Sequence, residues 1–65
     1  MRIRITSEST GAVQDECEWS EFYENNVDAY GREFMADAAN EVGATGAMLI
    51  DEGAGGTFRI ERIAQ

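Results

Sequence analysis

Carboxylates are the only reactive groups that this chain carries in number. Its 65 residues include thirteen Asp or Glu, five Arg and a single Cys, with no His and no Lys. Without His there is no imidazole base, and without Lys there is no amine for a Schiff base. A carboxylate pair such as Asp51 and Glu52 could perform glycosidase-like acid–base chemistry. That chemistry needs a cleft, and a chain of this length buries only about 60% of its surface around one thin core. We therefore expect a protein that is not an enzyme.

Three other features that could bind a ligand are better explained by structure. Cys17 lies among Asp15, Glu16 and Glu18, which disfavour its thiolate, so we interpret it as a small apolar residue on a strand. The glycine-rich segment 53–56 precedes an expected strand, whereas a phosphate-binding loop precedes a helix, so a hairpin turn is expected. Zinc is improbable without His, and the acidic residues around Cys17 lack the spacing and central Gly of a calcium loop. We expect no cofactor and no metal site.

The acidic residues of the central segment show the most informative pattern. If residues 19–42 form one helix with Phe34 at the centre of its buried face, these residues fall on two ridges, and Arg32 lies between the ridges. The ridges are Glu21, Glu24 and Asp28, and Glu33, Asp37 and Glu41. Like charges four residues apart destabilise a helix by about 0.2–0.5 kcal/mol per pair. A helix with a purely structural role would therefore alternate acidic and basic residues along each ridge.

The spacing of the ridges suggests a likeness to nucleic acid. Carboxylates four residues apart on a helix stand about 6 Å apart along its axis. Phosphates on one strand of DNA advance by about 3.4 Å. A carboxylate ridge can therefore imitate roughly every second phosphate.

Alternating polarity predicts the strands. Residues 1–6 alternate strictly between apolar and polar side chains, and residues 12–18 do so less regularly. A short apolar run over 47–51 and an alternating run over 57–61 flank the glycine-rich turn and should form a hairpin. We expect a single small acidic α+β domain over 1–65 with an antiparallel sheet of three or four strands.

The same alternation predicts the two faces of the sheet. In the second strand Val13 and Cys17 should face the core, and Asp15 is a misfit because it falls on the same face. In the last strand Phe58 and Ile60 should point inward. The outer face should carry Arg2, Arg4, Arg59 and Glu61.

Apolar residues at spacings of three and four predict a helix over 19–42 that ends before Gly43. Asn25, Asn26 and Gly31 interrupt good helix formers, so a short helix over 20–25 followed by a longer one over 27–42 is an alternative. The helical layer packs on one face of the sheet, giving ββαββ, or βαββ if residues 12–18 do not pair. Its buried stripe is Trp19, Phe22 or Tyr23, Val27, Tyr30, Phe34, Ala38 and Val42.

With its two acidic ridges on one short domain, the chain resembles the small acidic inhibitor proteins that phages encode. These include DNA-mimicking anti-CRISPR and anti-restriction proteins. The resemblance implies a non-enzymatic protein whose acidic surface docks on a basic nucleic-acid-binding protein or complex and competes with DNA or RNA. The six ridge residues would then contact the partner, and Trp19 or Tyr23 are candidates for an apolar contact.

Two other interpretations compete with this one. The acidic face can simply keep the protein soluble, or reflect an acidic proteome. Alternatively, the chain can be a structural, self-assembling module in which sheet faces or edges of copies meet. The net charge of −8 argues against direct binding to nucleic acid or to anionic membranes. We expect a cytoplasmic protein that is a monomer or a weak homodimer.

Overall fold

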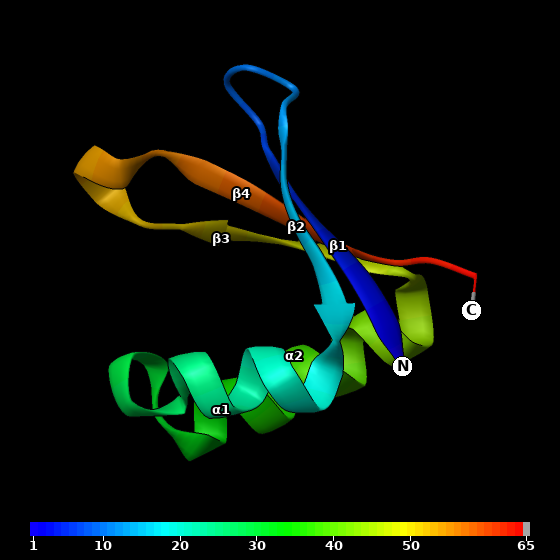
Figure 1. Ribbon diagram of the computed structural model, residues 1–65. Coiled ribbons are helices and arrows are strands. Elements are labelled where there is room, and N and C mark those ends of the chain that lie inside the picture. Colours follow the sequence, from blue (N-terminus) through cyan, green and yellow to red (C-terminus); the bar gives the residue numbers. More distant parts are fainter. Residues whose placement is uncertain (65) are drawn as a thin grey trace.

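The computed structural model describes residues 1–64, which form an α+β fold with a four-stranded antiparallel sheet and two helices (Figure 1). The sheet lies on one side, and the two helices lie beneath one end of it. Along the chain the elements are β1 (Arg2–Ser7), β2 (Val13–Glu18), α1 (Trp19–Tyr30), α2 (Arg32–Thr45), β3 (Ala47–Asp51), a 3₁₀ turn (Gly53–Gly55) and β4 (Thr57–Arg62).

The strand order is β2-β1-β4-β3, so the first and last strands are neighbours at the centre of the sheet. All three pairings are antiparallel, and Ile5 lies opposite Ile60 where β1 meets β4. The expected hairpin of residues 47–51 and 57–61 forms as β3 and β4. The second strand, left open by its sequence, pairs with β1 over Val13–Glu18.

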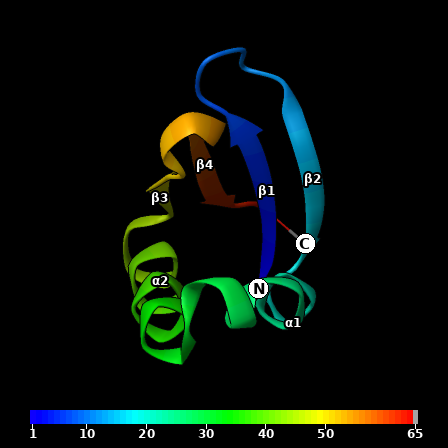
Figure 2. The same cartoon turned by 90° about the vertical axis from the view of Figure 1, so that its left-hand side faces the viewer.

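The prediction of one long helix over 19–42 is wrong. The alternative of two helices is confirmed, but the expected break at residue 26 is not where the chain breaks. The chain breaks at Gly31 instead, where φ is 90° and ψ is 154°. Such a conformation is essentially restricted to glycine. The Gly31 N–H donates to the carbonyl of Val27, and the N–H of Met35 donates to the carbonyl of Gly31. The second helix then runs back beside the first, so the arrangement is ββααββ (Figures 1 and 2).

The break at Gly31 changes which side of the second helix is buried. Phe34 was expected at the centre of the buried face but is 38% exposed, whereas Met35 is fully buried. A helix that restarts after a turn does not keep the phase of the helix before it. The α2 helix also extends past Gly43 to Thr45 and ends at Gly46, whose φ of 95° gives a left-handed cap.

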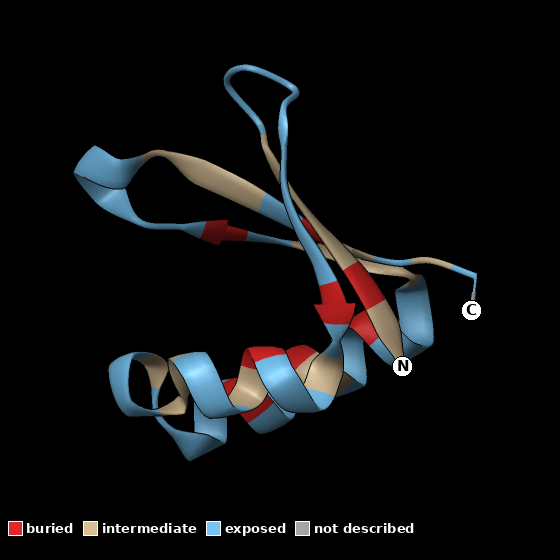
Figure 3. Cartoon of the chain, viewed as in Figure 1, coloured by how far each residue is buried: buried red, intermediate tan, exposed pale blue. Residues whose placement is uncertain are grey.

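The core lies where the helices meet the sheet (Figure 3). Its largest fully buried side chains are Ile3, Met35, Val42 and Ile60. Cys17 is buried as expected, but Val13 on the same strand is 54% exposed. A bulge explains this difference, because Ile5 lies opposite Asp15 and the next residue, Thr6, lies opposite Val13. The bulge leaves Gln14 unpaired and turns Val13 to the face that Thr6 occupies.

We predict that Gly31→Ala destabilises the protein by about 1–3 kcal/mol, because alanine cannot adopt this backbone conformation without strain. No atom lies within 4 Å of a Cβ added there, so the cost comes from the backbone alone. Urea unfolding followed by circular dichroism measures it. Gly43→Ala is the matched control, since Gly43 is helical with equally open surroundings. It should stabilise by up to ~1 kcal/mol. Equal effects from both variants would contradict this account of the turn.

Candidate functional site

The six acidic residues singled out by their spacing all lie on the exposed surface of the helical layer. In α1, Glu24 and Asp28 lie away from buried Phe22, whereas Glu21 lies beside Asp15 and Cys17 of β2. In α2 the acidic residues lie away from buried Met35. The sequence placed them on two flanks of one helix. The reversal at Gly31 instead places them on two neighbouring helices, three on each (Figure 2). These residues are Glu21, Glu24, Asp28, Glu33, Asp37 and Glu41, which we call the acidic helical surface.

Within residues 1–64, none of these six carboxylates forms an ion pair. Arg32, at the start of α2, is the one basic residue in the two helices, and it is exposed. The negative charge of this surface is therefore neutralised by solvent ions alone.

The arginines of the strands, in contrast, are matched to acidic residues of the sheet. Arg4 lies between Glu16 and Glu61, with N–O distances of 2.9 and 3.5 Å. Their guanidinium–carboxylate contacts raise the pKa of Arg4, with Glu16 the larger influence. Two further ion pairs on the sheet are Arg2–Glu18 and Arg59–Glu8.

The remaining arginine of the last strand, Arg62, is used to end a helix. Its Nη1 donates to the carbonyl of Gly43, 2.7 Å away, in the last turn of α2. A cation at a helix C-terminus interacts favourably with the helix dipole. The four arginines of the strands are thus engaged by carboxylates or by the end of α2, and Arg32 alone lies within the helices.

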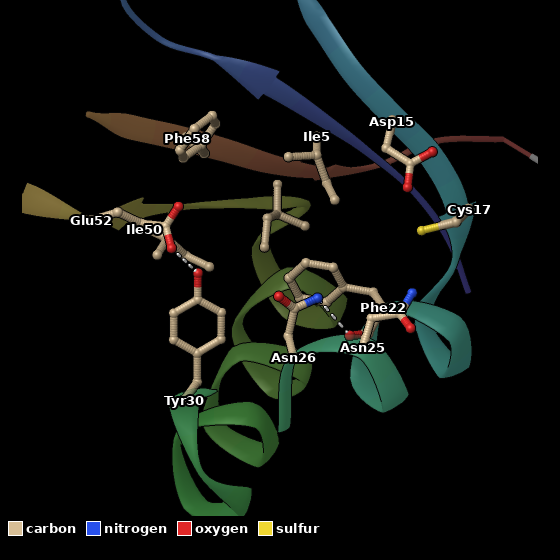
Figure 4. Close-up of a pocket in the computed structure, with 11 residues that line it drawn as sticks. Ile5, Asp15, Cys17, Phe22, Asn25, Asn26, Tyr30, Ile50, Glu52 and Phe58 are labelled. Carbon is tan, nitrogen blue, oxygen red and sulfur yellow. Dashed lines mark hydrogen bonds between the residues drawn. The ribbon is translucent and has the colours of Figure 1, made fainter. Parts of the chain in front are cut away.

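A second feature, which the sequence did not reveal, is a cavity of about 220 Å³ between the sheet and α1 (Figure 4). Its apolar wall consists of Ile5, Phe22, Ile50, Phe58 and Ile60. Its polar lining consists of Asp15, Cys17, Asn25, Asn26, Tyr30 and Glu52. The one signal in the sequence was Asp15, a carboxylate on a strand face that should have been apolar.

One side of this cavity is closed by a hydrogen bond between α1 and the loop after β3. The hydroxyl of Tyr30 donates to Oε2 of Glu52 (Figure 4). Burial of the phenol, followed by the contact with Glu52, raises the pKa of Tyr30 to about 12. Both influences favour the neutral hydroxyl, which is the form that donates.

Opposite Glu52, the side chains of Asp15, Cys17 and Glu21 offer three ligand atoms within 4.8 Å of one another. These are the groups that could hold a metal ion in the described part of the chain. Burial, assisted by the two carboxylates, raises the pKa of the Cys17 thiol. A protonated thiol is a poor ligand and a poor nucleophile.

Comparison of the chain with protein-family models, with curated proteins and with solved structures finds no match. Within residues 1–64, neither helix combines the length and apolar character that crossing a membrane requires.

We predict that Tyr30→Phe lowers the free energy of unfolding by about 1 kcal/mol at pH 7, because the hydrogen bond to Glu52 is lost. Since folding raises the pKa of Tyr30, the bond stabilises fully below pH 10. This contribution disappears as the pH rises toward 12. Urea unfolding at several pH values measures both effects. Tyr23→Phe is the control, because the Tyr23 hydroxyl makes no hydrogen bond within residues 1–64. An equal loss in the control would refute this role of Tyr30.

We also predict that iodoacetamide modifies Cys17 slowly at pH 8 in the folded protein and rapidly in urea. The thiol is 5% exposed, and its raised pKa reduces the thiolate that reacts. Mass spectrometry follows the reaction. Asp15→Asn should increase the folded-state rate, whereas Glu24→Gln on the outer side of α1 should not. Identical rates with and without urea would contradict the burial of Cys17.

Proposed function

We propose that this protein is a non-enzymatic inhibitor that docks its acidic helical surface on a basic nucleic-acid-binding partner and competes with DNA or RNA there. The observation that supports this proposal is the separation of charge. Residues 19–45 contain six carboxylates and one arginine, and these carboxylates have no ion-pair partner within residues 1–64.

A protein that needs acidic residues only for solubility gains nothing from gathering them in this way. Like charges four residues apart weaken each helix by about 0.2–0.5 kcal/mol per pair. The chain carries four arginines in its strands, yet these are engaged by sheet carboxylates or by the end of α2. The helices therefore carry six carboxylates without an ion-pair partner within residues 1–64, and their field would steer a basic partner and speed association.

The two helices give this face two rows of carboxylates. Packed helices have axes about 8–10 Å apart, and carboxylates within a row stand about 6 Å apart. A partner that binds the phosphates of a nucleic acid presents Lys and Arg side chains over such distances. This geometry supports the inhibitor type that the chain resembles, which includes anti-CRISPR and anti-restriction proteins.

Specificity requires an apolar contact in addition to charge. Trp19 and Tyr23, the candidates from the sequence, are partly buried and pack against the core. Phe34 is better placed, because it is 38% exposed and stands between Glu33 and Asp37 in the sequence of α2. Its ring stacks on Tyr30 with centroids 5.2 Å apart, which holds it in position. We propose Phe34 as the aromatic contact at the edge of the acidic helical surface.

The test is capture from bacterial lysate on immobilised protein, eluted by a salt gradient with and without a DNA duplex. We expect nucleic-acid-binding proteins to be retained, to elute as salt rises and to be released by the duplex. The captured protein, once purified, should lose a fluorescent duplex when the inhibitor is added. Asp37→Lys with Glu41→Lys should abolish both retention and displacement.

A second pair of variants separates local charge from net charge. Asp37→Asn with Glu41→Gln and Ala12→Lys with Gln14→Lys both change the net charge from −8 to −6. The first pair changes the helices, and the second changes exposed residues of the β1–β2 hairpin. Only the first should weaken displacement, by about tenfold. Equal weakening by both pairs, or retention of the same proteins by wild type and the charge-reversed variant, would refute the proposal.

One observation favours the alternative hypothesis that the chain is a self-assembling module. Leu49, on the edge strand β3, is 55% exposed and lies opposite Arg59. An exposed Leu on an edge strand is a contact through which copies can associate. Sedimentation equilibrium decides this question, because a mass that rises with concentration and falls in Leu49→Lys would favour the module over a monomeric inhibitor.

A further inference from the structure

The cavity between the sheet and α1 combines an apolar interior with acceptor groups at its mouth. Its apolar lining includes the buried side chains Phe22, Ile50 and Ile60. Asp15 and Glu52 also line it but are exposed, so their carboxylates lie where it meets solvent (Figure 4). The two carboxylates come from β2 and from the loop after β3, at opposite sides of the opening.

The charged groups of the lining are both carboxylates, which only accept hydrogen bonds when ionised. Neither Asp15 nor Glu52 forms an ion pair within residues 1–64, and no arginine lines the cavity. Glu52 uses Oε2 to accept from Tyr30, which leaves its other oxygen as an acceptor. One N–H of the Asn26 Nδ2 donates to the carbonyl of Phe22 at 2.9 Å, so its Oδ1 is free to accept from a ligand and its second N–H is free to donate.

The volume limits the size of an occupant. About 220 Å³ exceeds the roughly 150 Å³ of an apolar cavity that holds benzene. It is smaller than the roughly 300–1,000 Å³ of sites for drug-sized ligands. An occupant therefore consists of about one aromatic ring or short alkyl chain with a single polar head.

We propose that this cavity binds a small organic amine, with its apolar body against Phe22, Ile50 and Phe58 and its ammonium group at Asp15 or Glu52. An ammonium supplies donors and a positive charge to a mouth that offers acceptors and negative charge. An anion would be repelled, and a neutral molecule of the same shape would leave both carboxylates without a counter-charge. This site uses the inner side of α1 and does not depend on the acidic helical surface.

Binding is tested with 2-phenylethylamine, observed through amide shifts in ¹⁵N-labelled protein and through calorimetry. Two matched probes share its ring, the neutral 2-phenylethanol and the anionic phenylacetate. We expect the amine to shift the amides of cavity residues such as Ile5, Asn26 and Phe58, and to bind about tenfold more tightly than the alcohol. Phenylacetate should not bind. Equal affinity for amine and alcohol in the wild-type protein would overturn the proposal without any variant.

The same ammonium chemistry occurs on the lysine side chain of a protein. Nα-acetyl-lysine methylamide therefore forms a further arm of the experiment. Tighter binding of 2-phenylethylamine assigns the site to a free amine, as proposed. Tighter binding of the lysine derivative would overturn the proposal of a free amine as the ligand and assign the cavity to a lysine side chain of a partner protein.

Carboxamide variants locate the charge that matters. Asp15→Asn with Glu52→Gln should lower the affinity for 2-phenylethylamine at least about tenfold. The control is Glu33→Gln with Asp37→Asn, which removes two charges from the outer side of α2 and should leave the affinity unchanged. A loss of the same size in the control would show attraction to the net charge only, and would overturn the proposed site. Retained dispersion of the amide spectrum shows that each variant is folded.

Discussion

The burial of Met35 and Val42 from α2 in one cluster with Ile3 and Ile60 is the interaction on which the structure depends. These four are the largest fully buried side chains, and they join the second helix to the two central strands. Apolar burial contributes about 25 cal/mol for each Å² removed from water, so a small domain concentrates its stability at such a contact. Because β1 and β4 are the first and last strands, the same contact also ties together the two ends of the described chain.

This core lies at one end of the sheet, and the cavity follows from that position. The helices cover the part of the sheet near Ile3 and Ile60, while the two hairpin tips extend beyond them (Figures 1 and 3). Between the covered part and the tips, Ile5 and Phe58 face α1 across the cavity instead of packing on it. The hydrogen bond from Tyr30 to Glu52 spans this gap and fixes its width.

The sheet and the helices also differ in how their charges are paired. Arg2, Arg4 and Arg59 alternate with core residues along their strands, so they lie on the outer side of the sheet and contact nearby carboxylates. The carboxylates of the helices have few basic residues to pair with, because Arg32 is the single basic residue of the two helices. The strand arginines are thus engaged by carboxylates or by a helix end, whereas the six carboxylates of the helices have no ion-pair partner within residues 1–64, which is the basis of the proposed docking surface.

Side-chain patterns with a period of two, or of three to four residues, are local. For that reason the sequence by itself determined three of the strands, the helical segment, the inward-facing Cys17, Phe58 and Ile60, and the exposed acidic residues, and it left the second strand open. The helical pattern did not determine where the helix breaks, since Asn26 and Gly31 both weaken a helix; the break falls at Gly31, and Met35 and Val42 of α2 then lie in the core. That choice moved Phe34 to the surface and Met35 into the core. Nor could it reveal the cavity. The bulge at Gln14 and the joining of Asp15, Asn26 and Glu52 around one space depend on contacts between residues far apart in the chain, which only the tertiary structure decides.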